Sequence, residues 1–75
     1  MANEGERIVC DPNVLGGKPA VRGTRISVEH VLGMIAEGMG EDAICKSYPR
    51  LSREDVRACV VYAMGAVQQA HPSAA

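Results

Sequence analysis

Three cationic side chains lie in one glycine-rich segment of this 75-residue chain, and they are the first candidates for chemistry. The segment runs from Gly16 to Val28 and carries Lys18, Arg22 and Arg25 among three glycines and a proline. Glycine permits a positive φ or a close backbone approach, and proline fixes φ, so this composition predicts a loop of defined shape. Such a loop would present its cations to a phosphate or to an acidic protein surface. The alternative is a hairpin turn that merely carries surface cations.

A second basic group lies at the start of the last predicted helix. Its members are Arg50, Ser52, Arg53 and Arg57. Arg53 and Arg57 are four residues apart, so a helix places them on one face. In a helix-turn-helix protein the second helix of the motif enters the major groove, where arginine reads guanine or holds a phosphate. The alternative is that these arginines are surface charges paired with Glu54 or Asp55.

The remaining reactive side chains show no catalytic pattern. Most acidic residues fall at predicted helix starts and turns, where a structural role explains them. His30 and His71 have no partner four residues away, and Cys10, Cys45 and Cys59 lack the spacing of metal ligands. We therefore expect no enzyme, no metal site, no cofactor and reduced thiols.

The last predicted helix is apolar on nearly every side from Ala58 to Val67. A helix that is apolar on every face is buried on every face. The two other predicted helices and the small predicted sheet are too short to cover all of its faces. We therefore predict a dimer interface on this helix, formed by Val61, Tyr62, Met64 and Gly65. The alternative is that a small domain exposes some apolar side chains, which is common.

These groups must be positioned by a single domain that spans residues 1–75. Hydrophobic periodicity predicts helices over 27–38, 41–48 and 52–69. Segment 7–26 is predicted to hold short β segments at 7–10, 20–21 and 24–26 around the glycine-rich loop. The ends, 1–6 and 70–75, are expected to be frayed.

The predicted helix ends have local signals. Ser27 is a good N-cap for the first helix, and Gly38 suits the position just after its end. Ser52 with Asp55 three residues later resembles a capping box. The buried stripes are expected at Val28, Val31, Leu32 and Ile35 in the first helix, at Ala43, Ile44 and Tyr48 in the second, and at Val56, Cys59, Val60, Ala63 and Val67 in the third.

The overall composition places the chain among small cytoplasmic proteins. Its formal net charge is −1, which argues against a strongly basic nucleic-acid module without excluding a local basic patch. No apolar run is long enough to span a membrane, and the N-terminus lacks the layout of a signal peptide. A core without Phe or Trp rarely supplies more than about 3–5 kcal/mol, so we expect a stabilising partner.

Several short motifs together resemble a small prokaryotic family, the domain of unknown function numbered 433 (DUF433). They are Asp11-Pro12, Gly16-Gly17-Lys18-Pro19, Arg22-Gly23-Thr24-Arg25-Ile26, Val28, Gly38, Tyr48-Pro49 and Leu51, and the resemblance covers residues 7–67. The resemblance implies a homeodomain-like arrangement of helices. It also implies a predicted antitoxin that accompanies a PIN-like ribonuclease toxin.

The combined expectation is a mainly α, three-helix, homeodomain-like helix-turn-helix domain that is preceded by short β segments and forms a dimer. Its expected function is that of an antitoxin that binds and neutralises a PIN-like ribonuclease and binds operator DNA. In that role Lys18, Arg22 and Arg25 would contact either the carboxylates of the toxin or phosphate. The alternatives are a stand-alone helix-turn-helix regulator and a protein-interaction module without DNA binding.

Overall fold

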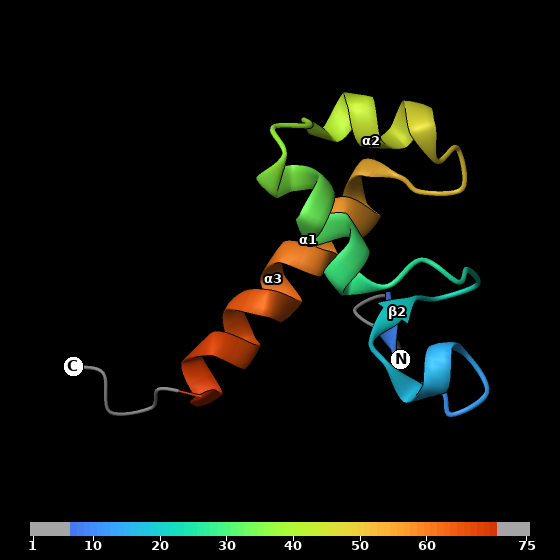
Figure 1. Ribbon diagram of the computed structural model, residues 1–75, viewed down its shortest axis with the longest axis vertical. Helices are drawn as coiled ribbons and strands as arrows, with labels where there is room; N and C mark the ends of the chain where they lie inside the picture. The colour runs from blue at the N-terminus through green and yellow to red at the C-terminus, as the bar shows by residue number, and fades with distance from the viewer. Residues whose placement is uncertain (1–6, 71–75) are drawn as a thin grey trace.

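A computed structural model describes residues 7–70, and it is mainly helical with a short two-stranded sheet near the N-terminus (Figure 1). The elements in chain order are β1 (Ile8–Val9), the 3-10 turn η1 (Leu15–Gly17), β2 (Ala20–Val21), α1 (Val28–Ala36), α2 (Glu41–Ser47) and α3 (Arg53–Ala70). The N-terminal part of α3 forms the centre, because α1, α2 and β1 all contact this helix. The frayed ends expected at 1–6 and 70–75 fall outside the described residues, except for the helical Ala70.

The helix ends confirm the local signals in the sequence. The Ser27 hydroxyl accepts a hydrogen bond from the His30 backbone N–H at 2.9 Å, and thereby caps α1. Beyond the other end of α1, Gly38 has a φ of +96°, which a residue with a Cβ would adopt only with strain. The Met39 N–H donates to the Met34 carbonyl and the Gly38 N–H to the Ile35 carbonyl, so α1 ends in a Schellman motif.

The capping box of α3 is also present. The Asp55 N–H donates to the Ser52 hydroxyl at 3.1 Å, and the Ser52 N–H donates to the Asp55 carboxylate at 3.0 Å. Asp55 also forms an ion pair with Arg7, whose guanidinium lies 3.0 Å from the carboxylate. One acidic side chain therefore fixes the start of α3 and joins it to the segment that leads into β1.

The sheet is smaller than expected. β1 and β2 pair antiparallel, with Ile8 opposite Val21 and Val9 opposite Ala20. The third strand predicted at 24–26 is wrong, since this segment is irregular and only the residue that follows it, Ser27, makes an isolated bridge, to Ala20. The reason is a side chain that competes with the strand: the Thr24 hydroxyl donates to the Val21 carbonyl and accepts from the Ile26 N–H.

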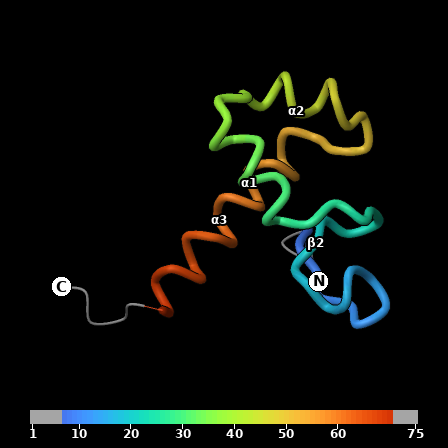
Figure 2. Tube along the Cα trace, viewed as in Figure 1, coloured from blue at the N-terminus to red at the C-terminus, as the bar shows by residue number. Residues whose placement is uncertain are grey.

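The buried core occupies only the first part of α3. Within residues 7–70 the buried apolar side chains are Ala20, Val21, Val28, Val31, Met34, Ile44, Leu51, Val56 and Cys59. Helix α3 continues for about three turns beyond Cys59, and Figure 2 shows this part running away from the other elements. The predicted buried stripe is therefore wrong at Val60 and Val67, which are 36% and 60% exposed, because the other described elements do not cover them. The stripe expected on α2 is wrong at Ala43, which is exposed, whereas its neighbour Ile44 is buried.

The thiols of Cys10 and Cys59 should differ strongly in reactivity. Burial, together with the nearby Asp55 carboxylate, raises the pKa of the Cys59 thiol from 9.0 to about 11, whereas Cys10 is exposed. The thiolate is the reactive form, so at pH 8 we expect iodoacetamide to modify Cys10 rapidly and Cys59 only after unfolding. Mass spectrometry of a labelling time course measures both rates, and equal rates in the folded chain would contradict the burial of Cys59.

The same pKa shift gives a pH dependence. The fold favours the neutral Cys59 thiol, so its contribution to stability is complete below pH 9 and is lost as the pH rises from 9 to about 11. A Cys59→Ala variant, which has no group to titrate, should lose less stability over this interval in urea unfolding experiments.

No helix in the described part of the chain, residues 7–70, has the length and apolar character needed to cross a membrane.

Candidate functional site

The turn that follows β2 positions two of the predicted loop cations. The Thr24 N–H donates to the Val21 carbonyl at 3.0 Å, which closes a β-turn with Arg22 and Gly23 at its centre. Gly23 has a φ of +79°, and a type II turn requires such a positive φ of its third residue. The Val21 N–H then donates to the Ile26 carbonyl at 3.0 Å, so the base of the loop is closed as well. Arg22 and Arg25 are therefore carried by a turn of fixed shape.

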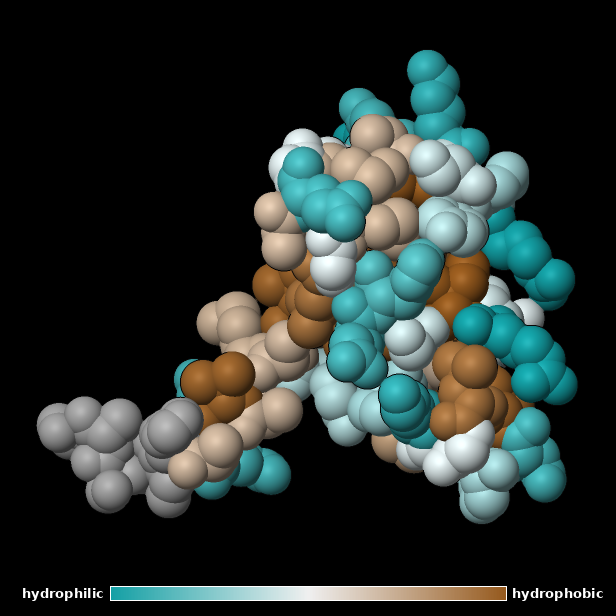
Figure 3. Space-filling view, in the orientation of Figure 1, coloured by the Kyte–Doolittle hydropathy of each residue, from teal (hydrophilic) through white to brown (hydrophobic). Residues whose placement is uncertain are grey.

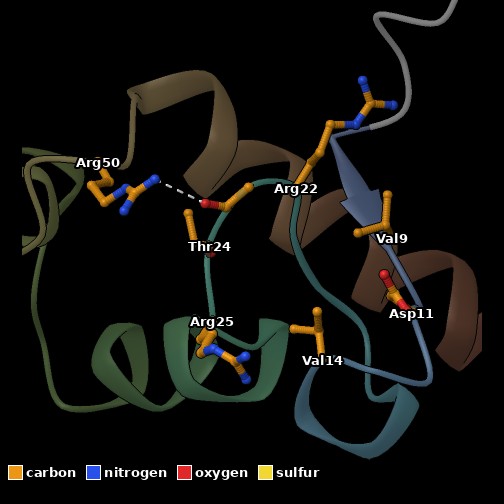
Figure 4. Close-up of a pocket in the computed structure, with 8 residues that line it drawn as sticks. Val9, Asp11, Val14, Arg22, Thr24, Arg25 and Arg50 are labelled. Atoms are coloured by element: carbon orange, nitrogen blue, oxygen red, sulfur yellow. Dashed lines mark hydrogen bonds between the residues drawn. The ribbon is translucent and has the colours of Figure 1, made fainter.

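Arg50 reaches this turn from the segment between α2 and α3. Its neighbour Leu51 is buried in the core and anchors the segment. The Arg50 guanidinium donates to the Gly23 carbonyl at 3.0 Å, across a sequence separation of 27 residues. Figure 4 shows Arg50 directed at the turn, with Arg25 below it.

Together these segments form an open cleft of about 730 Å³. Its lining consists of Val9, Asp11, Val14, Arg22, Gly23, Thr24, Arg25 and Arg50. In Figure 4 Arg50 and Arg25 lie on one side, Val9 and Asp11 lie on the other, and Arg22 extends toward the start of β1. The Asp11 carboxylate accepts a hydrogen bond from the Asn13 N–H at 2.9 Å. The lining of the cleft therefore contains the guanidinium groups of Arg22, Arg25 and Arg50 and the carboxylate of Asp11.

Lys18 does not join Arg22 and Arg25, although the sequence groups them. Its ammonium lies 3.6 Å from the Glu29 carboxylate in the first turn of α1. Its side chain lines a different, apolar groove between α1 and α3. The structure therefore separates Lys18 from Arg22 and Arg25. It places Arg50 beside these two arginines instead, although the sequence groups Arg50 with the arginines of the last helix.

The two α3 arginines pair with acids of α2 rather than with Glu54 or Asp55. Arg53 forms an ion pair with Asp42, and the Arg57 Nε lies 2.7 Å from the Glu41 carboxylate. The hydrogen bond from Arg57 lowers the pKa of Glu41, and the same contact raises the pKa of Arg57. All four side chains lie at the surface, so these pairs contribute little to stability, but they neutralise the α3 face predicted to bind DNA.

The C-terminal half of α3 forms a second candidate surface, which we name the apolar end of α3 and define as residues 60–67. Its most exposed large apolar residues are Val61 at 66%, Val67 at 60% and Met64 at 56%. Hydrophobic colours dominate the projecting part of α3 in Figure 3. No residue from Ala58 to Ala70 carries a charge.

Two shallow apolar grooves follow this surface. One, of about 390 Å³, is lined by Val60, Ala63, Met64, Val67 and Gln68. The other, of about 380 Å³, separates this helix from α1 and includes Tyr62. The Tyr62 hydroxyl also contacts the Cys10 sulfur at 4.0 Å, so this predicted interface residue is partly engaged within its own chain.

A contact between His30 and Tyr48 escapes analysis of the sequence alone. The His30 Nε2 lies 2.9 Å from the Tyr48 hydroxyl, and the two rings meet edge to face. Neither residue type nor spacing marks this pair, since 18 residues separate its members. Among residues 7–70, no group of three or more His, Cys, Asp or Glu side chains is placed to hold a metal ion.

Comparisons with known proteins agree with this fold. The chain is 35% identical over 63 residues to the uncharacterized protein y4eO of Sinorhizobium fredii (strain NBRC 101917 / NGR234). This match covers 84% of the chain and 28% of y4eO. It is also similar to the crystal structure of a DUF433 member protein from Anabaena variabilis ATCC 29413, with a TM-score of 0.77 and 30% identity. That match covers 84% of the chain and 62% of the solved one.

A family model supplies the assignment. The model described as protein of unknown function (DUF433) matches residues 8–63, which include β1, β2, the arginine-lined cleft, α1, α2 and the first half of α3. The chain therefore belongs to the DUF433 family.

Proposed function

We propose that this chain is the antitoxin of a toxin–antitoxin pair, and that it binds and neutralises a PIN-like ribonuclease in the cytoplasm. That the toxin is a PIN-like ribonuclease is what the resemblance to the DUF433 family implies. The observation that carries the protein-binding role is the apolar end of α3, which exposes Val61, Met64 and Val67 on an uncharged helix. A large apolar patch on a small protein marks an interaction site. The role is one of binding and assigns the chain no catalytic step.

The same helix supports the proposal of a homodimer. Val61, Met64 and Gly65 follow the i, i+3, i+4 spacing and share one face, and Tyr62 lies beside it. Glycine inside a helix costs roughly 0.5–1 kcal/mol relative to alanine. A Cβ added at Gly65 would meet no described atom within 4 Å, so packing within the chain does not account for this glycine. A second copy of α3 that approaches closely would account for it.

DNA binding is the second candidate function. Under this proposal the three helices form a homeodomain-like helix-turn-helix, and a dimer would span two half-sites of an operator. The observation that favours DNA is the arginine-lined cleft, because a local cationic surface can hold phosphate on a protein that is nearly neutral overall. The ion pairs of Arg53 and Arg57 with α2 favour the third possibility, a protein-interaction module without DNA binding.

Co-expression with the neighbouring gene tests the antitoxin proposal. We expect the tagged chain to co-purify as a stable complex with a PIN-like ribonuclease. We also expect that cells whose growth stops when they express the ribonuclease will grow again when they express the chain as well. The control is the nuclease with its metal-binding carboxylates replaced, which should still bind the chain but should not be toxic. A chain that purifies without a nuclease, and that leaves growth inhibition unchanged, would contradict the proposal.

A further inference from the structure

One residue of the loop between β1 and β2 has an unfavourable backbone conformation. Within residues 7–70, Leu15 is the only non-glycine residue with a positive φ, which is +52°. Gly16 follows with a φ of +65°, and the Gly17 N–H donates to the Val14 carbonyl at 3.0 Å. Two central residues of positive φ are typical of a type I′ turn, whose central positions favour glycine, asparagine and aspartate. The turn therefore disfavours leucine, because the left-handed conformation brings its Cβ close to a carbonyl oxygen.

The Leu15 side chain is not part of the buried core. It is 36% exposed, and the loop that carries it projects from the body of the molecule, away from α2 (Figure 1). The loop is tied in this shape, since the Val14 N–H also donates to the Asp11 carbonyl at 2.8 Å. Strained residues that the surrounding structure holds in place occur frequently at binding sites. Leu15 is thus an ordered apolar knob at the surface.

The groove of about 380 Å³ between α1 and α3, which we name the α1–α3 groove, suits an apolar occupant. Its walls are mostly apolar, and they include Val28, Leu32, Ala63, Ala66 and Val67. The two charged residues that line it, Lys18 and Glu29, lie 3.6 Å apart and neutralise each other. Segment 13–17, which carries the knob, has no charged residue. Leu15 does not line the groove of its own chain, so the groove is open to another leucine.

We propose that Leu15 of one copy inserts into the α1–α3 groove of a second copy of this chain. This contact rests on the proposed homodimer, and it lies outside the face formed by Val61, Met64 and Gly65. A twofold axis makes the contact reciprocal, so each copy supplies one knob and one groove. Burial of the Leu15 side chain in the dimer would offset the cost of its backbone conformation.

The knob and the groove are placed for such an exchange. At most about 11 Å of chain separates Leu15 from Lys18, which lines the groove, so both features belong to one surface. The groove also includes Tyr62, and it therefore continues onto the apolar end of α3. A contact that extends this apolar patch lets the dimer bury a larger area, as a stable interface requires.

The test is a double-mutant cycle on dimerisation. Leu15→Ala removes the knob, and Ala66→Leu fills the groove from an exposed position. Analytical ultracentrifugation measures the dissociation constants of the wild-type chain, both single variants and the double variant. Each single variant should raise the dissociation constant by about 10-fold, because a symmetric dimer loses the apolar contact twice. The effect of the double variant should be clearly smaller than the product of the two single effects, since residues in contact do not act independently.

Leu15→Met is the matched control, because it keeps a large apolar side chain and should dimerise like the wild-type chain. Urea unfolding of the monomer, at a concentration below the dissociation constant, is the second control. There the effects of Leu15→Ala and Ala66→Leu should add, because Leu15 does not line its own groove. The folded-to-unfolded ratio of Leu15→Gly should also be about fivefold higher than that of Leu15→Ala, the reverse of the order at an ordinary φ.

The outcomes separate this contact from the homodimer itself. A monomeric wild-type chain would contradict the homodimer and the contact together. A dimeric wild-type chain with an equally dimeric Leu15→Ala variant would overturn the contact alone, and a loss of nuclease binding in that variant would assign the knob to the nuclease. Additive effects in the dimer would also overturn it, because the knob would then meet another surface. A Leu15→Gly monomer less stable than Leu15→Ala would overturn it by showing that Leu15 is not strained.

Discussion

Replacing Val61 with glutamate is expected to separate the two proposed subunits without unfolding either of them. Val61 is 66% exposed in the single chain, so the substitution should change the unfolding free energy of the monomer by no more than about 0.5 kcal/mol. In the proposed dimer the new carboxylate would be buried among Met64, Gly65 and their counterparts without a partner. Burying an unpaired charge costs several kcal/mol, so the dissociation constant should rise by at least about 100-fold. Analytical ultracentrifugation over a concentration series measures this change.

A matched control is available on α2. Ala43→Glu also replaces an exposed apolar helical residue by glutamate, but it lies outside the apolar end of α3. We expect this variant to dimerise like the wild-type chain. A Val61→Glu protein that is folded and fully dimeric would show that the subunits meet on another face. A monomeric Ala43→Glu protein would show that net charge, rather than position, controls association.

Replacing Ile44 with alanine should unfold most of the isolated chain. Ile44 has no exposed surface and is the only buried residue of α2. Truncating a fully buried isoleucine to alanine costs about 2–5 kcal/mol. A domain of this size rarely has more than about 3–5 kcal/mol to lose. The variant should therefore show a large loss of helical circular dichroism at 37 °C and an early urea midpoint.

Val67→Ala is the control for this result, because Val67 is 60% exposed and its truncation leaves no cavity in the single chain. Its unfolding free energy should change by less than about 0.5 kcal/mol when measured at the same protein concentration. An Ile44→Ala chain with the wild-type midpoint would mean that α2 contributes little to the core. In that case the ion pairs from Asp42 and Glu41 to α3 would not depend on the packing of α2.

The helix ends were predictable because each depends on a few neighbouring residues. The caps at Ser27 and Ser52 and the left-handed Gly38 use hydrogen bonds that span three to five residues. Such signals are legible in a sequence without knowledge of the rest of the fold. The strand expected at 24–26 was wrong for a related reason. β propensity ignores the Thr24 hydroxyl, which forms hydrogen bonds within its own loop.

Periodicity located the apolar residues of α3 but did not indicate which of them would be covered. Val56, Cys59, Val60 and Val67 fit one helical stripe, yet only the first two are buried. Coverage depends on how far α1, α2 and β1 extend along α3, and the described elements pack against its N-terminal part. The exposed remainder is the basis of the proposed interface.

The sequence by itself determined the mainly helical fold, its helix ends and the presence of two basic groups. Only the tertiary structure decided which cations are neutralised and which remain available. Arg50 lies beside the loop arginines rather than those of α3, because it donates to the Gly23 carbonyl, which is 27 residues away in the sequence. Arg57 found its partner in Glu41, 16 residues earlier and on a different helix. Local spacing carries no information about such partners, because packing of the core brings distant segments together and so sets which charges meet.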